Sequence, residues 1–248
     1  PGAPDMTAAG RALDGQVAIV TGAGRGIGRA VAEALAREGA AVVLAARSRQ
    51  QLAEAAAAIR SGGGRALAIP TDVTQDAAVA ALVEQTVAEF GRLDVLVTAA
   101  GTASFGPVAG TKPADWDAML AVNLRAVMVC CCAVLPVMLQ QRRGTIVNIA
   151  SVAAQRFIPG AAAYAATKAG VVAWSRVLRE EVRAEGVRVG VLVPGAVDTP
   201  LWDAMPKGPD RARMLRPEDV ARTVVLMVSM PPGASLEELT LLPAGGIL

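Results

Sequence analysis

Apolar and polar positions along this chain recur with two different periods. Seven short apolar runs are typical of strands, at residues 16–20, 41–46, 66–70, 93–101, 144–151 and 187–195 and in "LEELTLLP" near residue 240. Between them, segments such as "IGRAVAEALAREG" and "QQLAEAAAAIRS" repeat apolar residues at the spacing of amphipathic helices. Nearly continuous apolar strands separated by helices indicate a parallel sheet that is covered on both faces.

The predicted fold class is therefore α/β: a single-domain, Rossmann-like, doubly wound parallel sheet with helices on both faces. We see no internal linker, low-complexity tract or short-period repeat, so one domain is expected over residues 15–248. Residues 1–14 are interpreted as a tag remnant and a flexible lead-in. They lack the charged start and apolar core of a signal peptide.

The overall composition excludes several classes of protein. Hydrophobic residues make up 53% of the chain and charged residues 19%, which argues against disorder. The net charge of +2 includes no long basic run, so we expect no nucleic-acid partner. The longest apolar run, residues 127–139, is too short to span a bilayer, so we expect no membrane association.

The use of histidine and cysteine narrows the chemistry further. The absence of histidine excludes a Ser-His-Asp triad, a Cys-His pair and a histidine-ligated metal. Cys130, Cys131 and Cys132 are consecutive and cannot form the spaced pairs of a zinc site, so no metal is expected. They lie in an apolar helical pattern, and we interpret them as free structural thiols. This implies a reducing compartment and a cytoplasmic protein.

A glycine-rich turn, "TGAGRGIG" (21–28), joins the first predicted strand to the first helix. Glycine permits positive φ and lets a phosphate approach the N–H groups at the start of a helix. The glycines stand at positions 22, 26 and 28, which is not the G-x-G-x-x-G spacing. The turn by itself predicts either a phosphate-binding loop or a tight turn with close helix–sheet packing.

The chain's single tyrosine lies in "AYAATKAG" (163–170), four positions before a lysine. In a helix, Tyr164 and Lys168 lie on the same face, one turn apart. Such a pair is usually an ordinary surface contact. A phenol has a pKa of about 10, and a nearby ammonium lowers it by favouring the phenolate, which would suit acid–base chemistry.

Several of these elements occur in a recognisable order. After the glycine turn come Asp72 in "TDVT", Asn123 in "VNL", Ser151, "YAATK" and "PGAVDT" (194–199), and Ser151 precedes Tyr164 by 13 residues. From Gly15 to its end the chain resembles the short-chain dehydrogenase/reductase family. The branch that contains 3-oxoacyl-(acyl carrier protein) reductases is the most similar.

The resemblance implies a catalytic role for four residues. Tyr164 would exchange a proton with the oxygen of a small carbonyl or alcohol substrate, while a nicotinamide exchanges a hydride with its carbon. Lys168 would also bind the nicotinamide ribose, Ser151 would hold the substrate oxygen, and Asn123 would support a water-linked proton relay. Without the resemblance, Ser151 would be interpreted as a capping residue and Asn123 as a buried hydrogen-bonding residue.

The resemblance also implies the cofactor-binding set, which is Gly22, Arg25, Gly26, Ile27, Gly28, Arg47, Asp72, Val73, Ala99, Gly101, Tyr164, Lys168, Pro194, Val197 and Thr199. Enzymes specific for NAD place an acidic residue about 20 positions past the glycine turn. That position is Ala46, followed by Arg47, so NADP(H) is predicted over NAD(H), with NAD possible. Arg47 could instead cap or solvate the next helix.

Two regions are expected to shape the site. The chain has "TAAG", residues 98–101, where the family has Asn-Asn-Ala-Gly, which puts the rigidity of the site in question more than its chemistry. In the family, residues 199–217 form a mobile lid, here with interspersed apolar residues at Trp202, Met205, Met214 and Leu215. Basic residues near the pocket mouth could attract an acidic substrate or simply be solvated; they are Arg156, Lys207, Arg211 and Arg213.

The segment from Trp116 to Leu139 is apolar around more of its circumference than one sheet face requires. The family pairs the matching helices between subunits, so we expect a homo-oligomer, most simply a tetramer. The expected function is oxidation or reduction of a ketone–alcohol pair. The alternatives are a 3-oxoacyl-(acyl carrier protein) reductase and a cofactor-sensing binding protein without turnover, although such proteins typically lack the tyrosine or the lysine.

Overall fold

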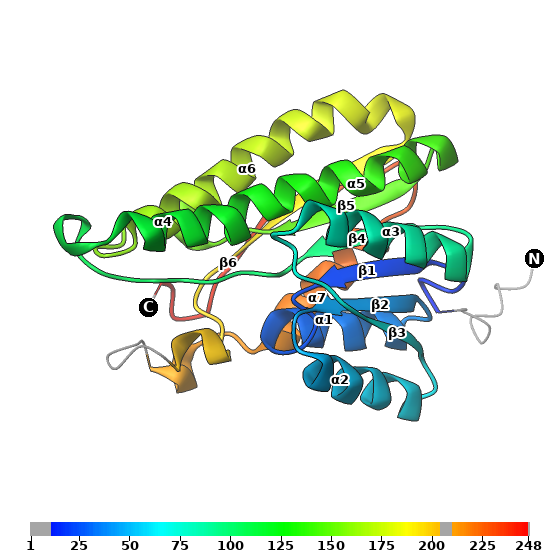
Figure 1. Ribbon diagram of the computed structural model, residues 1–248, viewed down its shortest axis with the longest axis horizontal. Helices are drawn as coiled ribbons and strands as arrows, with labels where there is room; N and C mark the ends of the chain where they lie inside the picture. Colours follow the sequence, from blue (N-terminus) through cyan, green and yellow to red (C-terminus); the bar gives the residue numbers. More distant parts are fainter. Residues whose placement is uncertain (1–10, 204–209, 248) are drawn as a thin grey trace, which may run out of the picture.

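The computed structural model describes residues 11–203 and 210–247 (Figure 1). Its strands are β1 (Val17–Thr21), β2 (Ala41–Ala46), β3 (Arg65–Pro70), β4 (Val95–Thr98), β5 (Gly144–Ile149), β6 (Val187–Pro194) and β7 (Glu238–Leu241). Its α-helices are α1 (Gly26–Arg37), α2 (Arg49–Ser61), α3 (Asp76–Phe90), α4 (Pro113–Leu120), α5 (Ala126–Gln141), α6 (Ala162–Val182) and α7 (Pro217–Val228).

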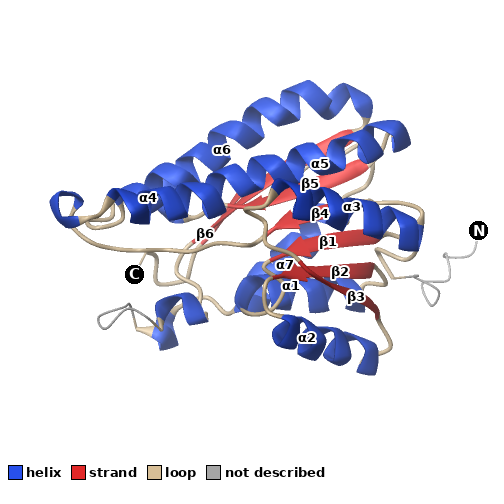
Figure 2. Ribbon diagram, viewed as in Figure 1, coloured by secondary structure: helices blue, strands red, loops and turns tan. Residues whose placement is uncertain are grey.

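The strands form one sheet in the order β3-β2-β1-β4-β5-β6-β7. Every neighbouring pair in this order is parallel (Figure 2). After β3 the chain crosses to the other side of β1 and begins β4. The strand order therefore reverses between β1 and β4, and open α/β sheets bind ligands at the carboxyl ends of strands near such a point.

Alternate side chains of each strand enter two separate cores. In β1, Ala18 and Val20 belong to the core under α1, α2 and α7, whereas Ile19 belongs to the core under α3, α5 and α6. Figure 1 shows these two helix layers on opposite sides of the sheet. Burial on both faces explains why the strands read as continuous apolar runs, and the predicted fold class is confirmed.

The start of the domain lies earlier than the predicted boundary at residue 15. Leu13 is fully buried, and its backbone N–H donates to the carbonyl of Glu38 at 2.9 Å. Residues 11–14 are therefore packed against the end of α1 and are not a flexible lead-in. Residues 1–10 lie outside the described residues.

The apolar helix is longer than the run that suggested it. The segment Pro113–Gln141 is helical throughout, with a π-helical turn at Ala121–Arg125 between α4 and α5. By length and composition it could cross a membrane, but 39% of its most apolar window is buried inside the fold. Because α5 packs on the sheet through residues such as Val127, Val134 and Met138, it is a core helix of this fold.

Two of the three cysteines fit the predicted role of buried thiols. Cys130 and Cys131 are buried, whereas Cys132 is exposed, and all three are free. Burial raises the pKa of both buried thiols to about 12, so they stay protonated and unreactive at neutral pH.

Candidate active site and cofactor site

Most of the predicted site residues follow the carboxyl ends of strands that meet at one edge of the sheet. The glycine turn follows β1, Arg47 follows β2, Asp72 and Val73 follow β3, Ala99 and Gly101 follow β4, Ser151 follows β5, and Val197 and Thr199 follow β6, which ends at Pro194. Tyr164 and Lys168 lie on α6, which contacts both β6 and the turn after Ser151. The topology thus brings residues from the whole length of the chain to one edge.

Packing requires glycine at two positions of the turn, and backbone conformation favours it at a third. A Cβ on Gly22 would lie 2.8 Å from the backbone of Ala100, and one on Gly28 would lie 2.3 Å from the Gly22 carbonyl oxygen. These two positions therefore exclude a side chain for packing reasons. Gly26 has φ +55° and begins α1, so it lets the chain enter the helix in a conformation that L side chains rarely adopt.

The N-terminus of α1 fits an anionic group. Arg25 occupies the N-cap position, but its side chain does not cap the helix, and the first turn carries no acidic residue. Among the described residues, no side chain therefore caps or neutralises the first-turn N–H groups of α1. Free N–H groups and the helix dipole favour a phosphate at this position. The arrangement suits the pyrophosphate of a dinucleotide.

The glycine turn lies against the end of β2. A Cβ on Gly24 would be 3.6 Å from the Cβ of Ala46, and Arg25 and Arg47 are both exposed. The Thr74 backbone N–H and hydroxyl hold the pKa of Asp72 below its usual value, and the positive charge of Arg47 lowers this pKa further. Arg47 is thus close enough to influence Asp72. Ser48, not Arg47, caps α2, since its Oγ accepts from Gln51 N–H at 3.3 Å.

A buried hydrogen-bond network braces the strands where the family's two asparagines are replaced. The hydroxyl of Thr98 donates to Asn148 Oδ1 at 2.7 Å, and Asn148 Nδ2 donates to Ser175 Oγ at 2.8 Å. This links β4 and β5 to α6. Thr21 Oγ1 accepts from the backbone N–H groups of Ala99 and Ala100 at 3.1 and 3.2 Å. These hydrogen bonds therefore hold the end of β4 in place although Thr98 and Ala99 replace the two asparagines.

Tyr164 and Lys168 lie one turn apart on α6, as their spacing predicts. Lys168 is buried, and its Nζ donates to the carbonyl of Ile149 at 2.9 Å. The same Nζ lies 5.9 Å from the centroid of the Tyr164 ring. Ser151 begins the short turn after β5, where its Oγ accepts from Ala153 N–H at 3.2 Å. Serine, tyrosine and lysine thus meet beyond the end of β5, and the capping role of Ser151 is also present.

The electrostatics of the tyrosine differ from the prediction. Burial raises the pKa of Tyr164, and the nearby Ser151 hydroxyl opposes this rise. Burial also lowers the pKa of Lys168 to about 8. The expected net lowering of the phenol pKa is wrong for this arrangement, because desolvation dominates.

The side chain of Asn123 is fully engaged in hydrogen bonds. It lies buried in the π-helical turn, where Oδ1 accepts from Thr102 N–H at 2.9 Å. Its Nδ2 donates to the Thr102 carbonyl at 2.8 Å and to Thr167 Oγ1 at 3.3 Å. Asn123 therefore joins the loop after β4 to Thr167 of α6, the residue that precedes Lys168. Its part in a proton relay stays a prediction.

The predicted lid, residues 199–217, is described at both of its ends. Leu215 is buried and forms a β-bridge with Val197, and Met214 is also buried. Trp202 closes a short turn at Pro200–Trp202. Met205 and Lys207 lie outside the described residues. Arg211 forms ion pairs with Asp198 and Asp203, so this arginine is already bound to carboxylates of its own chain.

Comparison with known proteins places this site in context. A family model described as short chain dehydrogenase matches residues 16–210. A 3-oxoacyl-(acyl-carrier-protein) reductase of Synechocystis sp. is 37% identical over 243 residues, which cover 96% of this chain and 98% of the relative.

Two solved structures of similar chains contain a nicotinamide cofactor. A metagenomic short-chain oxidoreductase in complex with NADP has a TM-score of 0.83 at 37% identity, covering 94% of this chain and 99% of that one. A variant of actinorhodin polyketide ketoreductase with NADPH has a TM-score of 0.85 at 30% identity, covering 92% and 96%.

Proposed function

Because the chain belongs to the short-chain dehydrogenase/reductase family of NAD(P)-dependent oxidoreductases, we propose that it interconverts a ketone and a secondary alcohol and uses NADP(H). The observation that carries this proposal is the meeting of Ser151, Tyr164 and Lys168 at the carboxyl end of β5, on the same sheet edge as the glycine turn. We also propose a cytoplasmic location, which accords with the free cysteines.

The residues of the chain fit a dinucleotide at this edge. The uncapped start of α1 would hold the pyrophosphate, Asp72 and the backbone at Ala99 would contact the adenosine, and Arg25 and Arg47 would bind a 2′-phosphate. A bound nicotinamide would supply or accept the hydride. Two similar structures that contain NADP or NADPH support this choice of cofactor.

Tyr164 would handle the proton. In the reductive direction its hydroxyl gives a proton to the substrate oxygen as the carbonyl carbon becomes an alcohol carbon, and in the oxidative direction the phenolate takes that proton back. Ser151 would hold the substrate oxygen through its hydroxyl. The raised pKa of Tyr164 favours the protonated phenol, which is the form that reduction requires.

A panel of ketones and secondary alcohols, followed by the absorbance of reduced nicotinamide, tests this function. We expect NADPH oxidation with at least one group of ketones, because the acid–base residues and the cofactor edge are both present. Cofactor binding should be measured in parallel by calorimetry. Binding of NADPH without turnover across the panel would contradict the proposal and would favour the cofactor-sensing alternative.

A second candidate is reduction of 3-oxoacyl thioesters on an acyl carrier protein, and the relative from Synechocystis favours it. The two candidates differ in the need for a protein partner. If the second is correct, a 3-oxoacyl group on acyl carrier protein should be reduced far more efficiently than the same group on N-acetylcysteamine. Equal efficiencies would exclude a specific role for the carrier.

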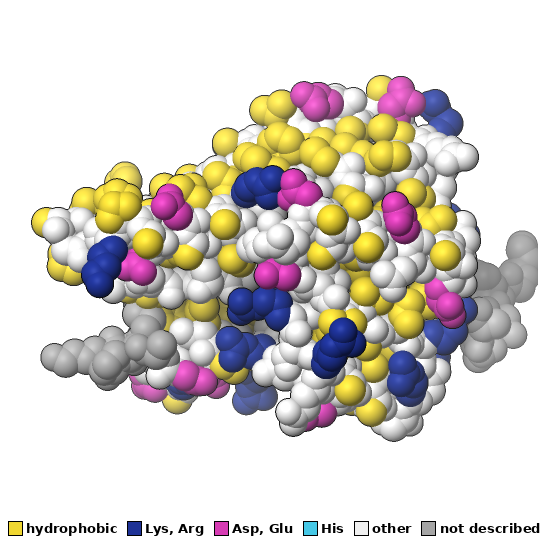
Figure 3. All heavy atoms as spheres, viewed as in Figure 1, with side chains coloured by type: hydrophobic (Ala, Val, Ile, Leu, Met, Phe, Trp, Pro, Cys, Tyr) yellow, Lys and Arg dark blue, Asp and Glu magenta, His cyan; other side chains and the backbone are white. Residues whose placement is uncertain are grey.

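We further propose that the chain forms a homo-oligomer, most simply a tetramer with two-fold axes. Figure 3 shows hydrophobic side chains gathered over the α4, α5 and α6 layer. The large apolar side chains exposed on α4 and α6 include Leu120, at 43%, and Val177, at 57%. Light scattering at micromolar concentration should give about four chain masses, and a stable monomer would contradict this prediction.

A further inference from the structure

Aromatic side chains are scarce in this protein, and one of them, Phe105, contacts the rings of both Tyr164 and Trp202. The chain has three Phe, three Trp and one Tyr in 248 residues. The rings of Phe105 and Tyr164 lie with centroids 5.8 Å apart at 44°, and those of Phe105 and Trp202 lie 6.1 Å apart at 16°. They come from the loop after β4, from α6 and from the beginning of the lid.

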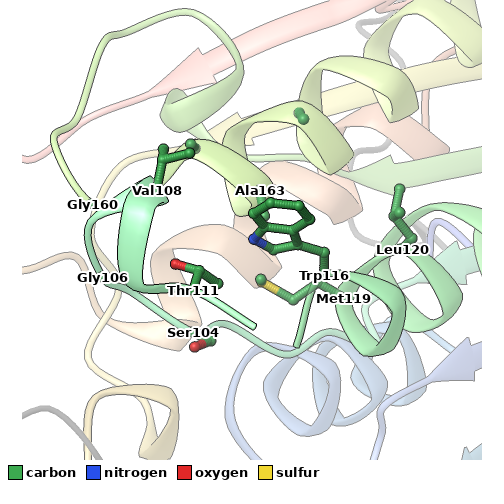
Figure 4. Close-up of a pocket in the computed structure, with 11 residues that line it drawn as sticks. Ser104, Gly106, Val108, Thr111, Trp116, Met119, Leu120, Gly160 and Ala163 are labelled. Atoms are coloured by element: carbon green, nitrogen blue, oxygen red, sulfur yellow. The ribbon is translucent and has the colours of Figure 1, made fainter. Parts of the chain in front are cut away.

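Phe105 differs from its two neighbours in what it contacts. Ser104 and Gly106 line a cavity of about 290 Å³, together with Trp116 and Ala163 (Figure 4). Phe105 is not part of that lining and instead contacts Tyr164 and Trp202. The loop is held in place where Gly106 N–H donates to the carbonyl of Gly160 at 2.9 Å.

Trp202 is held in place by a hydrogen bond of its indole ring. Its indole Nε1 donates to the carbonyl of Val197 at 2.9 Å, so the polar atom of the ring is satisfied within its own segment. The ring itself lies nearly parallel to Phe105. Phe105 and Trp202 thus form an uncharged stacked pair, in which Phe105 also contacts the ring of Tyr164. We call this pair the aromatic wall.

We infer that the aromatic wall selects ketones that carry an aromatic ring beside the carbonyl over saturated ketones of the same size; this inference rests on the proposed function. A carbonyl that reaches the Tyr164 hydroxyl places its substituents near the ring in contact with Tyr164. A saturated group there gains from burial alone. An aromatic group gains in addition from offset or edge-to-face contacts, which amount to roughly three- to tenfold in affinity.

The test uses two ketones with one skeleton, acetophenone and cyclohexyl methyl ketone, and the holoenzyme. Each variant's kcat/KM is expressed relative to wild type for each ketone, so that differences in intrinsic carbonyl reactivity cancel. In Phe105→Leu and Trp202→Leu we expect kcat/KM for acetophenone to fall roughly three- to tenfold, mainly because KM rises. We expect kcat/KM for the saturated ketone to change less than about twofold. Phe90→Leu, an aromatic-to-leucine change at the end of α3, serves as the matched control and should alter neither.

Calorimetric binding of both ketones to the NADP(H)-loaded protein gives a second readout that does not depend on turnover. Loss of acetophenone affinity in the wall variants supports the inference even if no ketone is reduced. In that case only the proposed function is contradicted. Equal losses of affinity for both ketones would overturn the inference, because the wall would then have only a structural role. No loss of affinity for either ketone would overturn it too, because the wall would then not contribute to binding. A wild type that binds the saturated ketone more tightly would overturn it as well.

Discussion

Tyr164→Phe should lower kcat by about 10²–10⁴-fold while leaving the Kd for NADP(H) nearly unchanged. The substitution removes the hydroxyl that would exchange a proton with the substrate oxygen. It retains the ring, and with it the packing against Phe105. Single-turnover rates of ketone reduction, together with cofactor titrations, would measure the two effects separately.

Lys168→Ala is the informative companion to this variant. It removes the Nζ that lies near the Tyr164 ring and binds the Ile149 carbonyl, and with it the predicted ribose contact. We therefore expect both turnover and cofactor binding to fall. Near-normal turnover in Tyr164→Phe would contradict the mechanism. A Tyr164→Phe variant that lost cofactor affinity as severely as Lys168→Ala would show that its effect is not confined to the proton.

Most of the fold could be predicted because its strands are buried on both faces. The run at residues 41–46 coincides with β2, and that at residues 144–151 contains β5. The boundary at Leu13 could not be predicted, since its burial depends on a contact with the end of α1. The long apolar segment at residues 116–139 was predicted, but the π-helical turn at Ala121–Arg125 within it was not, because the apolar pattern carries no signal for such a turn.

The candidate site was predictable where its signals are local. The glycine turn and the Tyr164–Lys168 spacing are both read within eight residues of sequence. The pKa of Tyr164 was predicted wrongly because burial is set by distant segments. The supporting residues Thr21, Asn148 and Ser175 were missed for the same reason. Asn148 did leave a signal, as a polar residue inside the apolar run "GTIVNIAS", but its partners become visible only when β4, β5 and α6 pack together.

The structure sharpens the question of cofactor choice at the end of β2. Ala46 ends the strand beside Gly24 of the glycine turn, so a carboxylate at this position would face the expected adenosine ribose. Because Ser48 caps α2, Arg47 is not required as the cap. Arg25 and Arg47 are exposed at the same edge. Their guanidinium groups can bind a 2′-phosphate, which brings nearly two negative charges, with charge-assisted hydrogen bonds.

We therefore predict that wild type prefers NADP(H) and that Ala46→Asp combined with Arg47→Ala reverses this preference. The new carboxylate accepts from the ribose 2′-OH of NAD(H) and repels a 2′-phosphate, while a charged hydrogen-bond donor is lost. Removing one such bond costs about 1.5–3 kcal/mol, which changes the ratio of kcat/KM for the two cofactors by roughly 10- to 10²-fold, and the new carboxylate increases this change. Comparison of both cofactors at constant ionic strength measures the ratio.

Arg49→Ala is the matched control for this comparison, because it removes an equal exposed charge two residues away, at the start of α2. If long-range attraction of a negatively charged cofactor determined the preference, Arg49→Ala would reduce it about as much as loss of Arg47, and added salt would remove the difference. If direct binding of the 2′-phosphate determines it, Arg49→Ala should retain the NADP(H) preference. A wild type that prefers NAD(H), or a double variant that still prefers NADP(H), would show that the end of β2 does not select the cofactor.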